Sequence, residues 1–328
     1  MKRVLRLLIQ TIVILIIVFF LFEMSYRFSI IDFYKAEFTH LNDADSIESK
    51  NIDYLVFGDS FSATQNNYID FLRSSTNKTF INSGVQGIGV KQVNTFLHRR
   101  IQKYQPKNII YQVYVGNDLI DVDHLTNYKK LPLVRNIYWD VSDLFLSSSY
   151  INYKLGYFKS RIKQINKTFN DERFSVKDYN QRSKLYFESD SEYLYKSVMT
   201  GGNFENRYSI WITELKEFVE NIPTDVNIFI VFIPHCSQLN SFYFNNMRQL
   251  GAKFSEENEF KKIGYDFFEK ASLDVKQYQN VIVLNPLQQL REVDAKEKRL
   301  YYLNDPHLNK EGQEVLGAFL KQELLSNK

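Results

Sequence analysis

Two short runs of the sequence carry the side-chain types that activate a serine hydroxyl. Gly58-Asp59-Ser60 follows an apolar run, and Asp305-Pro306-His307 precedes the last helical pattern. A serine becomes an effective nucleophile when a histidine takes its proton, and a carboxylate can hold that histidine in the required tautomer. Ser60 is therefore the candidate nucleophile, His307 the candidate general base and Asp305 the candidate orienting acid.

Two further runs could supply the hydrogen-bond donors that such chemistry needs. Asn82-Ser83-Gly84-Val85-Gln86-Gly87 and Gly116-Asn117-Asp118 each follow an apolar run. Glycine lets a backbone N–H approach a ligand closely, and an asparagine amide can donate to a developing oxyanion. Alone, each run is equally compatible with a turn or a helix cap. The order of all four runs along the chain is what supports their interpretation as one active site.

The elements that must position these runs alternate between strands and helices. Near-continuous apolar runs predict buried parallel strands at 52–57, 79–82, 108–115, 226–233 and 280–284. Helical stripes lie between them, at 90–104, 211–222, 260–271 and 315–320. This alternation predicts a three-layer α/β/α sandwich around a parallel sheet, with the active site at the carboxyl ends of the strands.

The N-terminus carries a membrane-spanning pattern. Three basic residues precede an apolar run from Leu7 to Phe22, which with its flanks reaches the roughly 20 residues that cross a bilayer. No small-residue cleavage site follows, so we expect an uncleaved anchor at 1–27 with its N-terminus in the cytoplasm. A stalk at 28–51 and a domain at 52–325 would then lie outside the inner membrane.

Residues 120–205 interrupt the strand–helix rhythm. This stretch is polar and rich in tyrosine, and we interpret it as an insertion beside the site. It is equally compatible with a lid or acceptor-binding subdomain and with a tolerated surface excursion.

Composition excludes several other classes of function. The 328 residues carry a net charge of only +3, and the sequence has no nucleic-acid motif, no phosphate-binding glycine loop and no zinc spacing. Cys236 is the single cysteine, so no intrachain disulfide can form. We expect no cofactor, no metal and no nucleic-acid partner.

In their order the four runs resemble blocks I, II, III and V of the SGNH/GDSL hydrolases. The resemblance covers residues 52–325 apart from the insertion and implies a flavodoxin-like fold with a five-stranded parallel sheet. It implies that Ser60 is the nucleophile and that its N–H is one oxyanion donor. It further implies Gly87 as a second donor, with Gly84 as the alternative, and Asn117 as the third.

The acid position departs from the common family pattern. Many members carry an aspartate three residues before the histidine, where this chain has Asn304. The shorter Asp305-x-His307 spacing resembles that of membrane-associated polysaccharide O-acetyltransferases in the same superfamily. An asparagine cannot stabilise an imidazolium as a carboxylate does, so Asp305 is the expected acid. Asp59 and Asp118 are expected to hold loops.

Three functions remain open at this point. The first is a serine esterase that removes ester groups, chiefly O-acetyl groups, from envelope or exported carbohydrate. The second is a polysaccharide O-acetyltransferase that uses the same residues and takes acetyl from membrane-bound polysaccharide machinery. The third is a catalytically inactive envelope scaffold. His235, which follows the fourth predicted strand, could also contact substrate.

Overall fold

The computed structural model describes residues 2–28, 49–64, 66–122, 145, 147, 171–295 and 298–326. The chain divides into two compact units. The first comprises Met1–Phe38 and Leu131–Lys167, and the second comprises Thr39–Lys130 and Thr168–Lys328.

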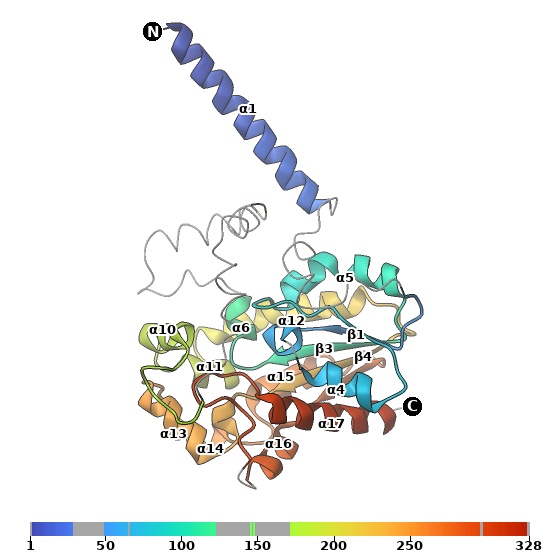
Figure 1. Ribbon diagram of the computed structural model, residues 1–328, viewed down its shortest axis with the longest axis vertical. Helices are drawn as coiled ribbons and strands as arrows, with labels where there is room; N and C mark the ends of the chain where they lie inside the picture. The colour runs from blue at the N-terminus through green and yellow to red at the C-terminus, as the bar shows by residue number, and fades with distance from the viewer. Residues whose placement is uncertain are drawn as a thin grey trace. The chain divides into compact units, whose positions relative to one another are not determined.

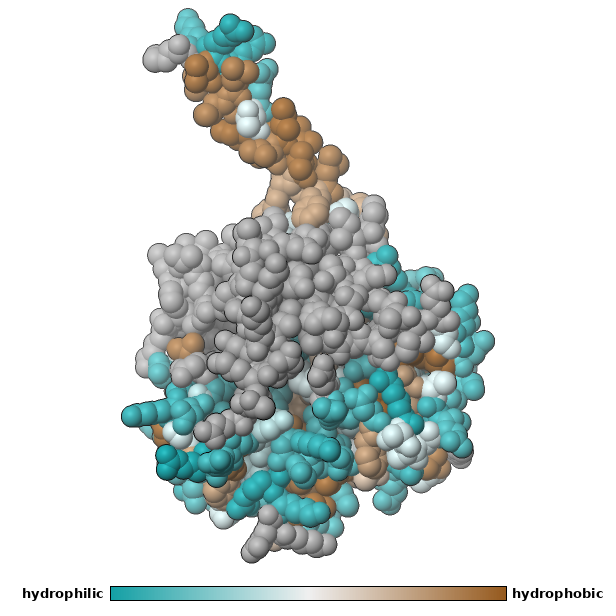
Figure 2. All heavy atoms as spheres, in the orientation of Figure 1, coloured by the Kyte–Doolittle hydropathy of each residue, from teal (hydrophilic) through white to brown (hydrophobic). Residues whose placement is uncertain are grey.

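The described residues of the first unit include an apolar helix, α1 (Lys2–Arg27). Its stretch Lys2–Ser25 is long and apolar enough to cross a membrane by length and composition. Figure 2 shows an almost continuous apolar surface along this helix, with hydrophilic side chains at its N-terminal end.

A piece of the expected insertion packs on α1 within this unit. The ring of Phe145 lies 5.1 Å from that of Phe19 and 6.2 Å from that of Phe20, both edge-on. The N–H of Ser147 donates to the buried carboxylate of Glu23 at 2.8 Å. Phe145 and Ser147, the described residues of this part of the stretch, therefore contact the N-terminal helix.

The second unit contains a parallel sheet of five strands in the order β2-β1-β3-β4-β5. Its strands are β1 (Tyr54–Phe57), β2 (Phe80–Asn82), β3 (Asn108–Tyr114), β4 (Asn227–Ile233) and β5 (Val281–Leu284). All five predicted strands are confirmed to within two residues of their expected bounds. Because every pairing is parallel, the carboxyl ends of the strands meet at one edge.

Helices cover both faces of this sheet, which confirms the predicted α/β/α sandwich. As Figure 1 shows, α5 (Val90–Tyr104) and α12 (Phe204–Glu220) lie together on one face, and α4 (Tyr68–Ser75) and α17 (Lys310–Ser326) lie on the other. The predicted stripes at 90–104 and 315–320 fall inside α5 and α17.

The central aromatic cluster joins one helical layer to the sheet. Trp211 of α12 is fully buried, and its ring meets Phe232 of β4 at 6.1 Å and Phe267 of α15 (Asp266–Asp274) at 4.8 Å. Such edge-on contacts add to the stabilisation that apolar burial provides.

The expected single helix over 260–271 is wrong. Phe260 ends α14 (Glu257–Phe260), whereas Phe267 belongs to α15. The chain turns between them at Gly264, where a Cβ would collide with the side chain of Glu269. Both phenylalanines are fully buried in the same core, so two elements together reproduce the apolar spacing of one helix.

The remaining described helices connect these layers or flank the site. They are α3 (Ser60–Ala63), α6 (Asp118–Asp121), α10 (Gln181–Ser189), α11 (Tyr193–Val198), η2 (Cys236–Gln238), α13 (Ser241–Gln249) and α16 (Leu287–Asp294). α10 and α11 belong to the return part of the expected insertion, which lies in the second unit. The helix expected at 150–166 lies outside the described residues.

At Gly312, α17 packs closely against the loop that carries His307. A Cβ at Gly312 would come within 2.7 Å of Leu308 Cδ2 and would collide with the carbonyl oxygen of Leu300. We expect Gly312→Ala to lower the free energy of unfolding by about 1–3 kcal/mol, because a rigid backbone group blocks the methyl. Thermal and denaturant unfolding measure the change.

Gly201→Ala is the matched control. The nearest atom that its Cβ would meet is 4.0 Å away, so its effect should stay within about 0.5 kcal/mol. Equal stability of the two variants would contradict the packing described for α17.

Candidate active site

Ser60 stands at the turn from β1, which lies between β2 and β3 in the sheet, into α3. β1 ends at Phe57, and the Asp59 carboxylate caps α3 by accepting the N–H of Phe61 at 3.0 Å. Gly58 is required here, since a Cβ would collide with the side chain of Gln112. That side chain accepts the N–H of Asp59 at 3.1 Å. The turn therefore holds Ser60 at the carboxyl edge of the sheet.

His307 lies on a tight loop ahead of α17. Tyr301 and Leu308 form an antiparallel bridge across this loop, and the N–H of Tyr302 donates to the His307 carbonyl at 3.1 Å. Gln313 connects α17 to the turn that carries Ser60, because its amide donates to the Phe61 carbonyl at 3.3 Å. Segments separated by about 250 residues in the sequence are thus locked together.

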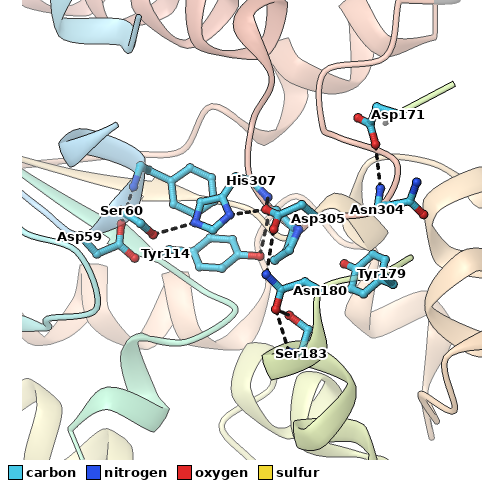
Figure 3. A network of polar contacts seen from close by, with 12 residues as sticks. Asp59, Ser60, Tyr114, Asp171, Tyr179, Asn180, Ser183, Asn304, Asp305 and His307 are labelled. Carbon is cyan, nitrogen blue, oxygen red and sulfur yellow. Dashed lines mark hydrogen bonds and ion pairs between the residues drawn. The ribbon is translucent and has the colours of Figure 1, made fainter. Parts of the chain in front are cut away.

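The structure brings the three predicted residues together in the order hydroxyl, imidazole, carboxylate (Figure 3). Ser60 Oγ lies 2.7 Å from His307 Nε2. His307 Nδ1 contacts Asp305 Oδ1, which also accepts the His307 backbone N–H at 3.0 Å. The His307 side chain is 30% exposed and Asp305 only 2%, so a ligand can reach the imidazole while the carboxylate is shielded from water.

The Asp305 carboxylate is held in its charged form. Burial acts to raise its pKa, but the neighbouring His307 and hydrogen bonds from His307 and Asn180 outweigh burial and lower the pKa below its ordinary value. A charged Asp305 suits a partner that must stabilise an imidazolium.

Asn304, three residues before His307, has other hydrogen-bond partners. Its Oδ1 accepts the N–H of Ser175 at 2.8 Å, and its Nδ2 donates to the Arg173 carbonyl at 2.8 Å. Both ends of the buried amide are therefore engaged by the segment that carries Arg173 and Ser175. The residue two positions before the histidine is the one that contacts it.

The two glycine candidates for the oxyanion hole differ in what their N–H groups do. The Gly84 N–H donates to Asn82 Oδ1 at 2.9 Å, and a Cβ at Gly84 would lie 2.6 Å from Ser62 Cβ. Gly87 is exposed, has a φ of +70°, and its N–H has no hydrogen-bond partner among the described residues. This difference favours Gly87 over Gly84, and its role as a donor stays a prediction.

Asn117 lies beside the turn that carries Asp59 and Ser60. It precedes α6, and its Nδ2 donates to Asp121 Oδ2 at 2.9 Å. Burial raises the pKa of Asp59, and the Asn117 side chain is one of the groups that counteract this rise. The amide is thus placed next to Asp59, the neighbour of Ser60; its role as an oxyanion donor also stays a prediction.

Asp118 holds the end of β3, as expected. It is buried, and its carboxylate accepts the N–H of Tyr114 at 2.5 Å and the hydroxyl of Tyr111 at 3.4 Å. Burial and the nearby Asp59 raise its pKa well above the ordinary value.

His235 has a structural place instead of the substrate contact considered for it. It is 2% exposed, and its Nδ1 caps η2 through Ser237 Oγ at 2.7 Å and the Ser237 N–H at 3.2 Å. Burial lowers its pKa to about 3, so the ring stays neutral near pH 7. His307, on the loop ahead of α17, is the histidine whose ring lies 2.7 Å from Ser60 Oγ.

Asn180 is the site residue that sequence reasoning missed. Its Nδ2 donates to Asp305 Oδ2 at 2.8 Å, and it caps α10. An asparagine before a helical run signals a cap, but nothing in the sequence connects this cap with Asp305.

Across the described ranges, no group of three or more His, Cys, Asp and Glu side chains could hold a metal ion.

Comparison with known proteins gives likenesses only among solved structures. No family model matches the chain, and no curated protein matches it. It is similar to a lipase/acylhydrolase from Enterococcus faecalis, with 11% identity, 84% of this chain and 97% of that one covered, and a TM-score of 0.43. It is also similar to a catalytic mutant of an acetylxylan esterase from Geobacillus stearothermophilus, with 9% identity, 84% and 96% covered, and a TM-score of 0.42.

The buried His235 generates a pH prediction. Its pKa is about 3 in the folded chain and about 6.5 when unfolded, so the unfolded chain binds more protons between these values. Its burial therefore makes the protein less stable as the pH falls from about 6.5 toward 3. His235→Asn keeps an acceptor for the Ser237 N–H but removes the titrating ring.

We expect the variant to lose stability less steeply on acidification, by up to about 1.4 kcal/mol per pH unit within that window. Denaturant unfolding of both proteins between pH 6.5 and 4 measures the two slopes. Parallel slopes would contradict a neutral, buried His235.

Proposed function

We propose that this chain is a serine esterase that removes ester groups, chiefly O-acetyl groups, from envelope or exported carbohydrate. The observation that carries the proposal is the 2.7 Å contact between Ser60 Oγ and His307 Nε2, continued on the far side of the ring by Asp305. Hydroxyl, imidazole and carboxylate in this order are the arrangement that activates a serine for attack on a carbonyl.

In the proposed reaction His307 takes the Ser60 proton while Oγ attacks the ester carbon. The N–H groups of Ser60 and Gly87 and the amide of Asn117 would stabilise the charge on the carbonyl oxygen. The tetrahedral intermediate then expels the alcohol, which receives its proton from His307, and leaves an acyl group on Ser60. Water activated by the same imidazole releases the acid, and Asp305 keeps the ring in the productive tautomer throughout.

We further propose that α1 is a single membrane anchor with its N-terminus in the cytoplasm. Its length and apolar surface support a membrane span, and the basic residues at its start support this orientation. The esterase unit would then face the envelope side, where acetylated glycans are within reach. An anchored enzyme could also exchange acetyl groups with membrane machinery, so transfer to a sugar hydroxyl is the outcome to be distinguished from hydrolysis.

Ester turnover by the detergent-solubilised full chain tests the proposal. We expect wild-type protein to release acetate from an acetyl ester such as p-nitrophenyl acetate, and Ser60→Ala to lower kcat by about 10⁴-fold or more, since the nucleophile is removed. Ser74→Ala, at an exposed position of α4, is the control and should keep wild-type turnover.

Adding a soluble glycan acceptor separates the two reactions. Acetylated glycan formed at the expense of free acetate would identify a transferase. A folded wild-type chain that neither hydrolyses acetyl esters nor acetylates glycans would contradict the proposed chemistry and leave a scaffold as the better reading.

The assignment of the acid can be tested by a neighbouring pair of variants. Asp305→Asn should lower kcat by about 10²- to 10⁴-fold, because the imidazole loses its orienting carboxylate. Asn304→Ala should instead lower stability by about 1–3 kcal/mol through its lost bonds to Arg173 and Ser175, with kcat within about threefold of wild type. The reverse pattern of kcat losses would show that the acid is misassigned.

A further inference from the structure

The return part of the insertion makes an extended set of hydrogen bonds with the loop that carries the acid. Asp171 accepts the N–H groups of Leu303 at 2.7 Å and Asn304 at 3.0 Å, and Asn180 donates its own N–H to the Asn304 carbonyl at 2.9 Å. Figure 3 shows Asp171 next to Asn304 and Asn180 next to Asp305. Within the part of the chain that the structure describes, residues 171–180 therefore contact the loop that carries Asp305 at several points.

We infer that Asn180 is a positioning residue, whose amide fixes the Asp305 carboxylate and through it the imidazole of His307. The inference rests on the proposed function and adds to it a fourth group, carried by the insertion. Asn180 touches neither the nucleophile nor a reacting atom, so its effect passes entirely through Asp305.

The two oxygens of Asp305 have separate partners. Oδ1 contacts the His307 ring, whereas Oδ2 accepts from Asn180 Nδ2 at 2.8 Å. Turning the carboxylate about its Cβ–Cγ bond would weaken both contacts together. Because Asp305 is almost fully buried, water cannot readily replace a lost donor, and an unsatisfied charged acceptor carries a large penalty.

The amide of Asn180 is itself held in one orientation. Its Oδ1 accepts the N–H of Ser183 at 3.1 Å, while its Nδ2 faces Asp305. A flipped amide would set an oxygen against the carboxylate and an NH₂ against the Ser183 N–H, so only the observed orientation satisfies both neighbours. The hydrogen bond that caps α10 therefore orients Asn180 Nδ2 toward Asp305.

A purely capping role for Asn180 makes a different prediction from a positioning role. Serine and aspartate cap helices about as well as asparagine, so Asn180→Ser and Asn180→Asp both preserve the α10 cap. Neither variant can donate the amide hydrogen bond to Asp305. The serine is too short to span the gap, and the aspartate places a second carboxylate against the first.

Asn240 provides a matched control elsewhere in the fold. It caps α13, a helix of nine residues like α10, by accepting the N–H of Tyr243 at 3.2 Å. Its Nδ2 donates to Asp294, another buried carboxylate, which takes no part in the site. Asn240→Ser and Asn240→Asp therefore remove the same kind of bond without touching Asp305.

The experiment compares kcat and KM for acetyl-ester hydrolysis by the four full-length variants and wild type. We expect kcat to fall about tenfold in Asn180→Ser and further in Asn180→Asp, with KM changed less than about twofold, since the lost bond is to a charged group and not to substrate. Both Asn240 variants should keep wild-type kcat. Wild-type kcat in both Asn180 variants would overturn the inference.

A substrate-free readout separates this inference from the proposed reaction. The proton shared by His307 Nδ1 and Asp305 should give a low-field proton NMR resonance that is absent in Asp305→Asn. We expect Asn180→Ser to shift or broaden it, and Asn240→Ser to leave it unchanged. A shift in a chain without ester turnover would support the positioning role and refute the esterase; an unmoved resonance would refute the positioning role.

Discussion

The burial of one carboxylate is the constraint on which the site depends. A charged Asp305 almost out of contact with water is tolerated only if every oxygen finds a donor. The imidazole of His307 and the amide of Asn180 meet that need from opposite sides. Each donor comes from a different part of the chain, so satisfying the buried charge also assembles the proposed catalytic arrangement.

The parallel sheet supplies the frame for this assembly. Strand β1 delivers Ser60 to the carboxyl edge, and the capping carboxylate of Asp59 fixes the turn. The histidine loop is secured by its own antiparallel bridge and by Gln313, which joins α17 to the nucleophile turn. The hydroxyl and the imidazole can therefore meet without adjustment of the backbone.

Sequence reasoning predicted what local patterns encode. Continuous apolar runs placed the five strands, and the residues after them placed Ser60, while the choice of Asp305 over Asn304 followed from charge. The single helix over 260–271 was wrong because Phe260 and Phe267 face one core from two elements. The periodicity of apolar residues does not reveal the turn that separates the two helices.

Contacts between segments that are distant in the sequence could not be predicted from it. The cap at Asn180 is a local signal, but its second hydrogen bond goes to a residue 125 positions away. His235 follows a strand end as a catalytic residue would, yet burial and its cap on η2 give it a structural place. The side-chain partners of Asn304 likewise come from Arg173 and Ser175, and no periodic pattern in the sequence encodes how that segment is placed against the loop.

Covalent labelling with a fluorophosphonate, mapped by mass spectrometry on the full chain, tests the central claim most directly. The contact between Ser60 and His307 predicts a phosphonyl adduct on Ser60 in the wild type, and loss of that adduct in a folded His307→Gln variant. An unlabelled Ser60 in folded wild-type protein, or equal labelling rates in the two proteins, would contradict the account.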